Sequence, residues 1–236
     1  MTGLRVGLAG LGSPVRHDVL VNTRTGPAPA TALQLLLAAE RLFAEHGLAG
    51  VSLRQISIEA GSSNNSAIQY HFGSKDDLLR AIFAYRLNDL TQRRTLLRAR
   101  AHPDDLRAQL EAHVLPLIEL AESPDSSYVS FIEQLQRAGA TDVFTHQPDA
   151  MRSQEEFSSR MQRLLPHIPE SVRSMRIQQA QDLAVHLAAE RERAIRRDDA
   201  VVPFALFVSG VVDGLAGFLQ VPASAETEQL IARENS

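Results

Sequence analysis

Residues 51–79 read VSLRQISIEAGSSNNSAIQYHFGSKDDLL, and this stretch contains two short helical patterns followed by the start of a longer one. Ser52 and Gln55 have the spacing of a capping box, which predicts a short helix over residues 53–60. A glycine-containing turn follows, and a second short helix is expected over residues 65–72. Two short helices joined by such a turn favour a helix-turn-helix unit.

Helical patterns continue on both sides of this unit. Upstream, apolar residues recur at steps of three and four over residues 31–46, and Gly47 ends that helix. Downstream, Ser74 and Asp77 form a second capping pattern, so a longer helix is expected from Lys75 to about Arg98. Further helices are predicted over 104–122, 127–139, 154–165, 169–197 and 202–221, and a loop over 141–152. Because alternating β-branched and aromatic runs are absent, the expected fold class is all-α.

The composition excludes several classes of function. The 236 residues include no cysteine, so disulfides, cysteine-ligated metals and a thiol nucleophile are excluded. The eight histidines show no metal-binding spacing, and no metal site or cofactor is expected. No apolar run approaches the length of a membrane-spanning helix, which predicts a cytoplasmic protein without a membrane partner.

The charges are divided unevenly along the chain. Residues 1–100 contain 12 basic and 7 acidic residues, whereas residues 101–236 contain 12 basic and 21 acidic residues. A positive half joined to a negative half indicates that one end of the protein meets a polyanion. Only Lys75 is a lysine among the 24 basic residues, and this preference for arginine suggests a bacterial source.

The landmarks of the first hundred residues occur in a familiar order. They are Ala39-Glu-Arg-Leu-Phe43, Glu45-His-Gly47, Val51-Ser-Leu-Arg-Gln-Ile56, Ala60-Gly61, Tyr70-His-Phe72 and Ser74-Lys-Asp-Asp-Leu-Leu79. Over residues 31–86 the chain resembles the N-terminal DNA-binding domain of the tetracycline-repressor (TetR) family. The resemblance implies a three-helix DNA-binding domain over 30–86 and a larger helical ligand-binding and dimerisation domain over 87–236. Residues 1–29, rich in glycine and proline, are expected to form a disordered arm.

The resemblance also implies which residues face DNA. The candidates are Ser52, Arg54, Asn65, Ser66, Gln69, Tyr70, His71 and Lys75. Asparagine and glutamine amides can pair with adenine in the major groove, while lysine and arginine contact phosphates. Between Gly61 and Tyr70 the chain carries one residue more than the family pattern, so two registers of the recognition helix remain open.

The C-terminal part has the features of a sensor and dimer domain. Residues 202–221 are apolar nearly all round and include Gly210, Gly214 and Gly217, so this helix is expected to be buried. The resemblance implies a homodimer through residues 169–221, and an intrachain packing groove is the alternative. Candidates for binding a small-molecule effector are His113, Tyr128, Phe131, Phe157, Met161, Met175, His186 and Asp213. A carboxylate in so apolar a helix as that of Asp213 needs a partner.

These observations predict a DNA-binding transcriptional regulator that is not an enzyme. The expected form is a ligand-responsive repressor that binds a palindromic double-stranded operator as a homodimer. An all-helical enzyme or small-molecule carrier with no role on DNA is the alternative, although no nucleophile–base pair, metal cluster or phosphate loop supports it. An architectural DNA binder is expected to be basic, whereas this chain has a net charge of −4.

Overall fold

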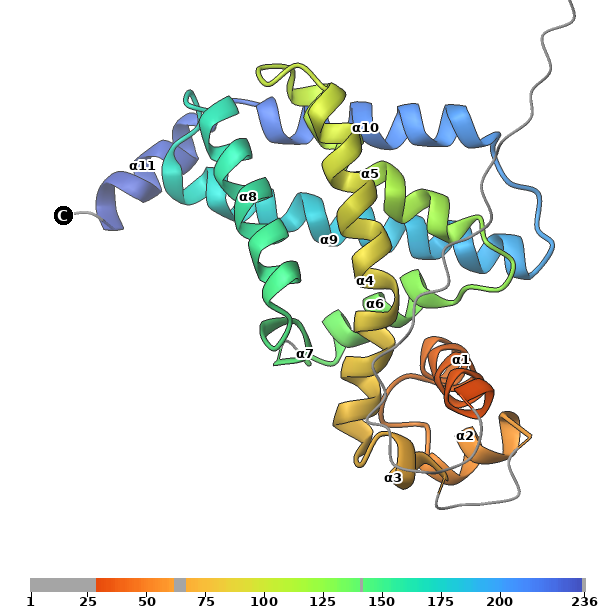
Figure 1. Ribbon diagram of the computed structural model, residues 1–236. Coiled ribbons are helices and arrows are strands. Elements are labelled where there is room, and N and C mark those ends of the chain that lie inside the picture. Colours follow the sequence, from red (N-terminus) through yellow and green to blue (C-terminus); the bar gives the residue numbers. More distant parts are fainter. Residues whose placement is uncertain (1–28, 62–66, 141, 235–236) are drawn as a thin grey trace, which may run out of the picture.

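The computed structural model describes residues 29–61, 67–140 and 142–234, and every regular element in these ranges is an α-helix (Figure 1). The all-α class predicted from the sequence is therefore confirmed. The predicted N-terminal arm lies outside the described residues, except for Pro29, where the first helix begins. The helices are α1 (Pro29–His46), α2 (Leu53–Glu59), α3 (Ala67–His71), α4 (Lys75–Arg100), α5 (Leu106–Ala121), α6 (Tyr128–Arg137), α7 (Asp142–Thr145), α8 (Pro148–Leu164), α9 (Glu170–Arg196), α10 (Phe204–Gln220) and α11 (Ala225–Glu234).

The first three helices and the start of α4 form the small domain at the bottom of Figure 1. Phe43, Ile56, Ile68 and Ile82 come from these four helices, and all four side chains are fully buried. Gly47 ends α1 with a φ of 74°, a left-handed conformation that a residue without a Cβ adopts at little cost. The chain can therefore turn sharply from α1 towards α2, as the sequence predicts.

Helix α4 is a single 26-residue element that joins the small domain to the larger helical bundle (Figure 1). Its first turns bury Leu78 and Ile82 in the small domain. Its later turns lie against α5 and α8. The domain boundary expected after Arg86 thus falls inside a continuous helix.

The larger bundle is organised around α9, which contacts α5, α6, α8 and α10. Helix α6 lies between α9 and the small domain, and its Tyr128, Phe131 and Leu135 side chains are almost completely inaccessible to solvent. Phe131 also contacts Phe43 of α1, with ring centroids 6.3 Å apart. The two domains therefore share one continuous apolar core at α1 and α6.

The segment 141–152 differs from the sequence-based expectation. The sequence predicts a loop there, but the segment contains the short helix α7 and the first turn of α8. Pro148 at the start of α8 is compatible with helix, because the first turn needs no N–H donor there. Ser153, Phe157 and Met161 then recur at four-residue steps and are buried, which gives α8 its inner face.

The last two helices differ in burial. Helix α10 buries Val208, Val212, Leu215 and Leu219, whereas α11, which the sequence did not predict, buries no residue. Within the described ranges, no single helix is long and apolar enough to cross a membrane. By length and composition, α10 and α11 satisfy that criterion only as a pair, across a bend of 56°.

Candidate functional site

Helix α2 begins at the capping box that the sequence predicts. The Ser52 Oγ accepts the Gln55 backbone N–H at 3.3 Å, and the Gln55 Oε1 accepts the Ser52 backbone N–H at 2.8 Å. Ile56 is fully buried, while Arg54 and Ser52 are exposed. Arg54 forms no ion pair with any residue that the structure describes, so its guanidinium is available to a phosphate group.

Helix α3 presents one buried and one exposed face. Ala67 and Ile68 are buried, whereas Gln69 and Tyr70 are exposed, with 51% of Tyr70 accessible to solvent. These two exposed side chains are therefore accessible to DNA, as the resemblance implies. The candidates Asn65 and Ser66 lie outside the described residues.

His71 at the end of α3 is placed differently from its two neighbours. Its side chain is half-buried, and its Nε2 is inaccessible and makes no hydrogen bond with a described residue. The imidazole meets the Tyr70 ring edge-on, with centroids 5.2 Å apart. The position is thus less suited to a direct DNA contact than those of Gln69 and Tyr70.

Lys75 points into the protein. Its Nζ donates hydrogen bonds to the backbone carbonyl oxygens of Leu48 and Val51, at 2.5 and 2.7 Å, and lies 5.3 Å from the centroid of the Phe43 ring. These contacts tie the turn between α1 and α2 to the first residue of α4. The sequence indicates a phosphate contact for Lys75 and contains no sign of this internal role.

The N-terminus of α4 is already satisfied by the chain itself. Ser74 caps the helix: its Oγ accepts the Asp77 N–H at 3.1 Å and donates to the Asp77 Oδ2 at 2.6 Å. That hydrogen bond, with the charge of Arg80, lowers the pKa of Asp77. A carboxylate thus lies where a free helix N-terminus would attract a phosphate.

The eight ligand-binding candidates do not form one site. Tyr128, Phe131, Phe157 and Met161 are buried. The Tyr128 hydroxyl donates to the Phe83 carbonyl oxygen at 3.0 Å, and burial raises the pKa of this phenol. Tyr128 and Phe131 are therefore parts of the core between the domains.

Three other candidates lie on the outside of the chain, and their role in ligand binding stays a prediction. Met175 is 52% exposed, and His186 is exposed with its Nδ1 2.7 Å from a carboxylate oxygen of Glu133. Asp213 is also exposed, and its Oδ1 accepts a hydrogen bond of 2.8 Å from the Arg107 Nε. The partner that Asp213 needs is present, but on the outer face of α10.

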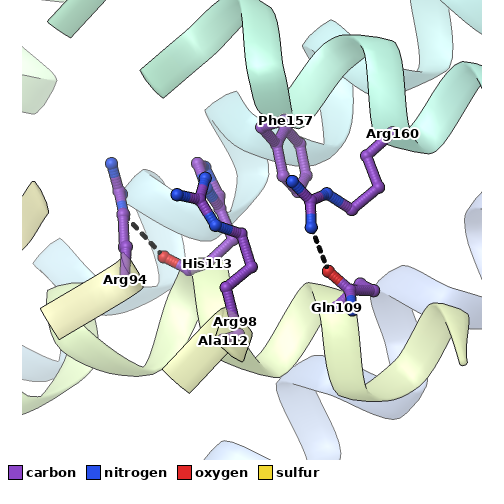
Figure 2. Close-up of a pocket in the computed structure, with 7 residues that line it drawn as sticks. All are labelled: Arg94, Arg98, Gln109, Ala112, His113, Phe157 and Arg160. Atoms are coloured by element: carbon purple, nitrogen blue, oxygen red, sulfur yellow. Dashed lines mark hydrogen bonds between the residues drawn. The ribbon is translucent and has the colours of Figure 1, made fainter. Parts of the chain in front are cut away.

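Only His113 and Phe157 of the eight candidates line the small pocket between α4, α5 and α8 (Figure 2). Their rings stack with centroids 3.7 Å apart. The sequence did not identify the other lining residues, which are Arg94, Arg98, Gln109, Ala112 and Arg160. A spacing of four residues places Arg94 and Arg98 on one face of α4, but no local pattern connects them with Arg160 on α8.

The pocket is strongly basic. Burial is the main reason that the pKa of Arg94 falls to about 10, and the neighbouring charge of Arg98 lowers it further. Burial and the charges of the three arginines hold the pKa of His113 well below its usual range. At neutral pH the imidazole is therefore uncharged, and the positive charge of the pocket is carried by the guanidinium groups.

The chain is similar to known bacterial regulators in sequence and in fold. Residues 35–82 match the family model described as bacterial regulatory proteins, tetR family. The fold is similar to that of a tetR-family regulatory protein from Rhodococcus RHA1, with a TM-score of 0.55 at 18% identity over 84% of this chain and 100% of the other. It is also similar to PfmR, a TetR family transcriptional regulator from Thermus thermophilus, with a TM-score of 0.54 at 18% identity over 79% and 99%. No protein of curated function matches.

The matched segment includes the helix-turn-helix geometry described above. It begins in α1, contains α2 and α3 with the exposed Arg54, Gln69 and Tyr70, and ends in the first turns of α4. The surrounding all-helical fold agrees with that of the tetR-family structures. Residues 35–82 therefore form a helix-turn-helix domain of the tetR type, a DNA-binding domain of bacterial regulators, and the described chain around it has the fold of tetR-family structures.

Proposed function

We propose that the protein is a repressor that binds a palindromic operator as a homodimer and responds to a small-molecule effector in the cytoplasm. Its partners are then double-stranded DNA, a second copy of the chain and the effector. The observation that carries the proposal is the outer face of α10, where apolar side chains are exposed and the glycines border open space.

This outer face combines apolar side chains with glycines. Leu206 and Val221 are 63% and 55% exposed, and Phe218 is 37% exposed. Gly210, Gly214 and Gly217 lie on the same helix, and a Cβ added to any of them would meet no atom within 4 Å. The packing of one chain therefore does not require glycine at these positions.

Glycine inside a helix costs about 1 kcal/mol relative to alanine, so three of them call for a compensating contact. A second helix can approach a glycine-bearing face closely, and the exposed apolar residues would then be buried. An intrachain packing groove is the alternative, and the open space around the three glycines within one chain favours the dimer over it. Helix α9, which packs against α10, exposes Met175 and Leu183 and would extend the interface predicted for residues 169–221.

The DNA-binding surface follows from the exposed residues of the small domain. Gln69 and Tyr70 on α3 would enter the major groove, and Arg54 with Ser52 at the start of α2 would meet a phosphate. Asn65 and Ser66 remain proposals from the family resemblance, as does the register of the helix. A two-fold symmetric dimer would place two such surfaces on the two halves of a palindrome.

The test begins with selection of bound sequences from a random DNA library by the full-length protein. We expect an inverted repeat whose half-sites are separated by one helical turn or a multiple of it. Sedimentation of the complex should give an even number of subunits per repeat. A promoter that overlaps the repeat should lose transcription when the protein is added. A non-repeated site bound by one subunit would exclude the dimeric operator complex, and increased transcription would exclude repression.

A further inference from the structure

Three arginines from two helices converge on the pocket between α4, α5 and α8. Arg94 and Arg98 lie one turn apart on α4, and Arg160 approaches from α8 on the other side of the space in Figure 2. The remaining wall consists of residues from α5 and the Phe157 ring of α8. The lining therefore carries three positive charges and no carboxylate.

One carboxylate, that of Glu156, partly offsets two of these charges, those of Arg98 and Arg160. Within the described residues, Glu156 accepts a hydrogen bond from the Arg98 Nη1 at 2.8 Å. Arg94 uses its Nε for a neutral acceptor, a backbone carbonyl oxygen of α5 at 2.9 Å. Arg160 donates from Nη1 to a neutral side-chain amide of α5 at 2.9 Å, while its Nε is buried without a described partner.

Burial of an ion without a counter-ion is strongly unfavourable. Arg94 is in this situation, and burial is the largest cause of its lowered pKa. Arg160 is half-buried: burial lowers its pKa and the charge of Glu156 opposes that effect. His113, which is uncharged at neutral pH, offers no negative charge to offset them. The three guanidinium groups therefore repel one another across the pocket.

An anion would remove this repulsion. The guanidinium group presents its N–H donors in a fork that matches the oxygens of a carboxylate or a phosphate. The free space measures about 10 Å³, so it admits an oxygen atom of such a group and not a large apolar molecule. Phe157 and Ala112 would contact the carbon atoms next to that group.

We propose that this pocket binds a small anionic group, a carboxylate or another oxyanion, between Arg94, Arg98 and Arg160. Such an anion is the effector, or the acidic end of a larger one, in the ligand response proposed above. The regulatory part of this inference rests on that proposed function. The binding part rests only on the charges and distances of the pocket.

The first experiment measures thermal unfolding of the full-length protein at constant ionic strength. Acetate, butyrate and inorganic phosphate are titrated, with acetamide and butyramide as neutral controls of matching shape. We expect a saturable rise in the unfolding temperature with at least one anion and none with the amides, because a ligand that binds only the folded state stabilises it. Response to acetate or phosphate would identify a free small anion. Response to butyrate alone would identify the acid end of a longer ligand.

Two variants test whether the anion binds in this pocket. Arg160→Gln should weaken anion binding by about tenfold or more, because it removes charge-assisted hydrogen bonds. It should also raise the unfolding temperature of the anion-free protein, since a repelling charge is lost. Arg163→Gln is the matched control: Arg163 is an exposed arginine on the same helix and does not line the pocket. Its anion binding should equal that of the unchanged protein.

A second readout is the titration of His113 by NMR, assigned with a His113→Gln variant. A bound anion should raise the pKa of this imidazole, because it opposes the effect of the arginines. Equal stabilisation by amides, unchanged binding in Arg160→Gln, or an unaltered His113 titration at saturating anion would each overturn the proposed pocket. Operator affinity is measured in parallel: anion binding that leaves it unchanged would keep the pocket and overturn the ligand response.

Discussion

The Glu40 carboxylate in α1 accepts a hydrogen bond of 2.8 Å from the backbone N–H of Ser127, immediately before α6. The Glu40 side chain is only 2% exposed, and the Arg86 Nε lies 3.7 Å from it. A second buried carboxylate, Glu192 of α9, accepts the N–H groups of Val129 and Ser130 at 3.2 and 2.8 Å. The free N–H groups at the start of α6 thus donate to two carboxylates, one from the small domain and one from the central helix of the bundle.

This arrangement predicts a large effect of Glu40→Ala on stability. The substitution leaves the Ser127 N–H and the Arg86 guanidinium without their partner in a buried place. The free energy of unfolding should fall by about 3 kcal/mol or more. Urea denaturation measures it, and Glu45→Ala, at an exposed site on the same helix, is the control. Equal effects of the two substitutions would contradict a structural role for Glu40.

Glu40 also predicts a specific pH dependence. Burial raises the pKa of this carboxyl above its ordinary value of 4.5, although Arg86 opposes the change. As the pH falls, the folded state therefore binds this proton first. The stability that this proton contributes is fully present below about pH 4.5, and it is lost as the pH rises through the pKa of Glu40 in the folded state.

Glu40→Gln cannot titrate, so it isolates this contribution. The difference in unfolding free energy between the unchanged protein and the variant should move in favour of the unchanged protein as the pH falls from about 7.5 to about 5. The lowered pKa values of Asp77, Glu133 and Glu190 affect both proteins and cancel in the difference. A difference that stays constant over this range would refute the prediction.

Lys75→Met distinguishes an internal role from a DNA contact. Loss of the hydrogen bonds to Leu48 and Val51 should lower the free energy of unfolding by about 1–3 kcal/mol. If Lys75 binds no phosphate, the salt dependence of DNA affinity should keep its slope. A slope smaller by about 0.9 per subunit would instead show that Lys75 contacts a phosphate.

Gln69 and Arg54 should make different contacts with DNA: Gln69 with a base and Arg54 with a phosphate. Gln69→Ala should cost about 1–3 kcal/mol per half-site and relax the preference at one base position. Arg54→Ala should weaken specific and non-specific DNA alike, and lower the salt slope by about 0.9 for each phosphate that the variant no longer binds. Fluorescence anisotropy with operator and random duplexes at several salt concentrations separates the two. Intact specificity in Gln69→Ala would place base reading at other residues of α3.

Gly214→Leu should weaken the dimer without unfolding the chain. The new side chain has open space in one chain and removes a glycine from a helix, so the monomer should lose no stability. It would, however, keep a second α10 from approaching closely. Light scattering at micromolar concentration measures the change, with Ala99→Leu at an exposed site of α4 as the control. A Gly214→Leu protein as dimeric as the control would exclude this face from the interface.

Local patterns predict the starts of helices well. Ser52 with Gln55, and Ser74 with Asp77, satisfy backbone groups within four residues, so the chain order alone contains that information. Whether a residue in an apolar helix is buried or exposed depends on residues that are distant in the sequence. Asp213 illustrates this, because its partner Arg107 is 106 residues away on α5.

The pocket was largely hidden from sequence analysis for the same reason. Arginine is most often a surface residue, and nothing near Arg94 in the chain indicates that α8 will cover it. His113 and Phe157 stand out in the sequence only as aromatic residues in apolar stretches, with no sign that their rings stack. Candidate DNA-facing residues can be named from the sequence alone, because a short motif with fixed spacing contains them, and their contacts with DNA stay a prediction.

Helix α4 connects the helix-turn-helix with the arginine pocket, and a contact between these two ends fixes its position. The Tyr128 hydroxyl holds the backbone of α4 at Phe83, 8 residues from Lys75 and 11 from Arg94. At 1.5 Å per residue these arms are about 12 and 16 Å long. A rigid rod pivoting at Phe83 would convert a shift of about 1 Å at Arg94 into about 0.7 Å at Lys75, in the opposite direction. Because Lys75 is hydrogen-bonded to the turn before α2, the helix-turn-helix formed by α2 and α3 would move with it.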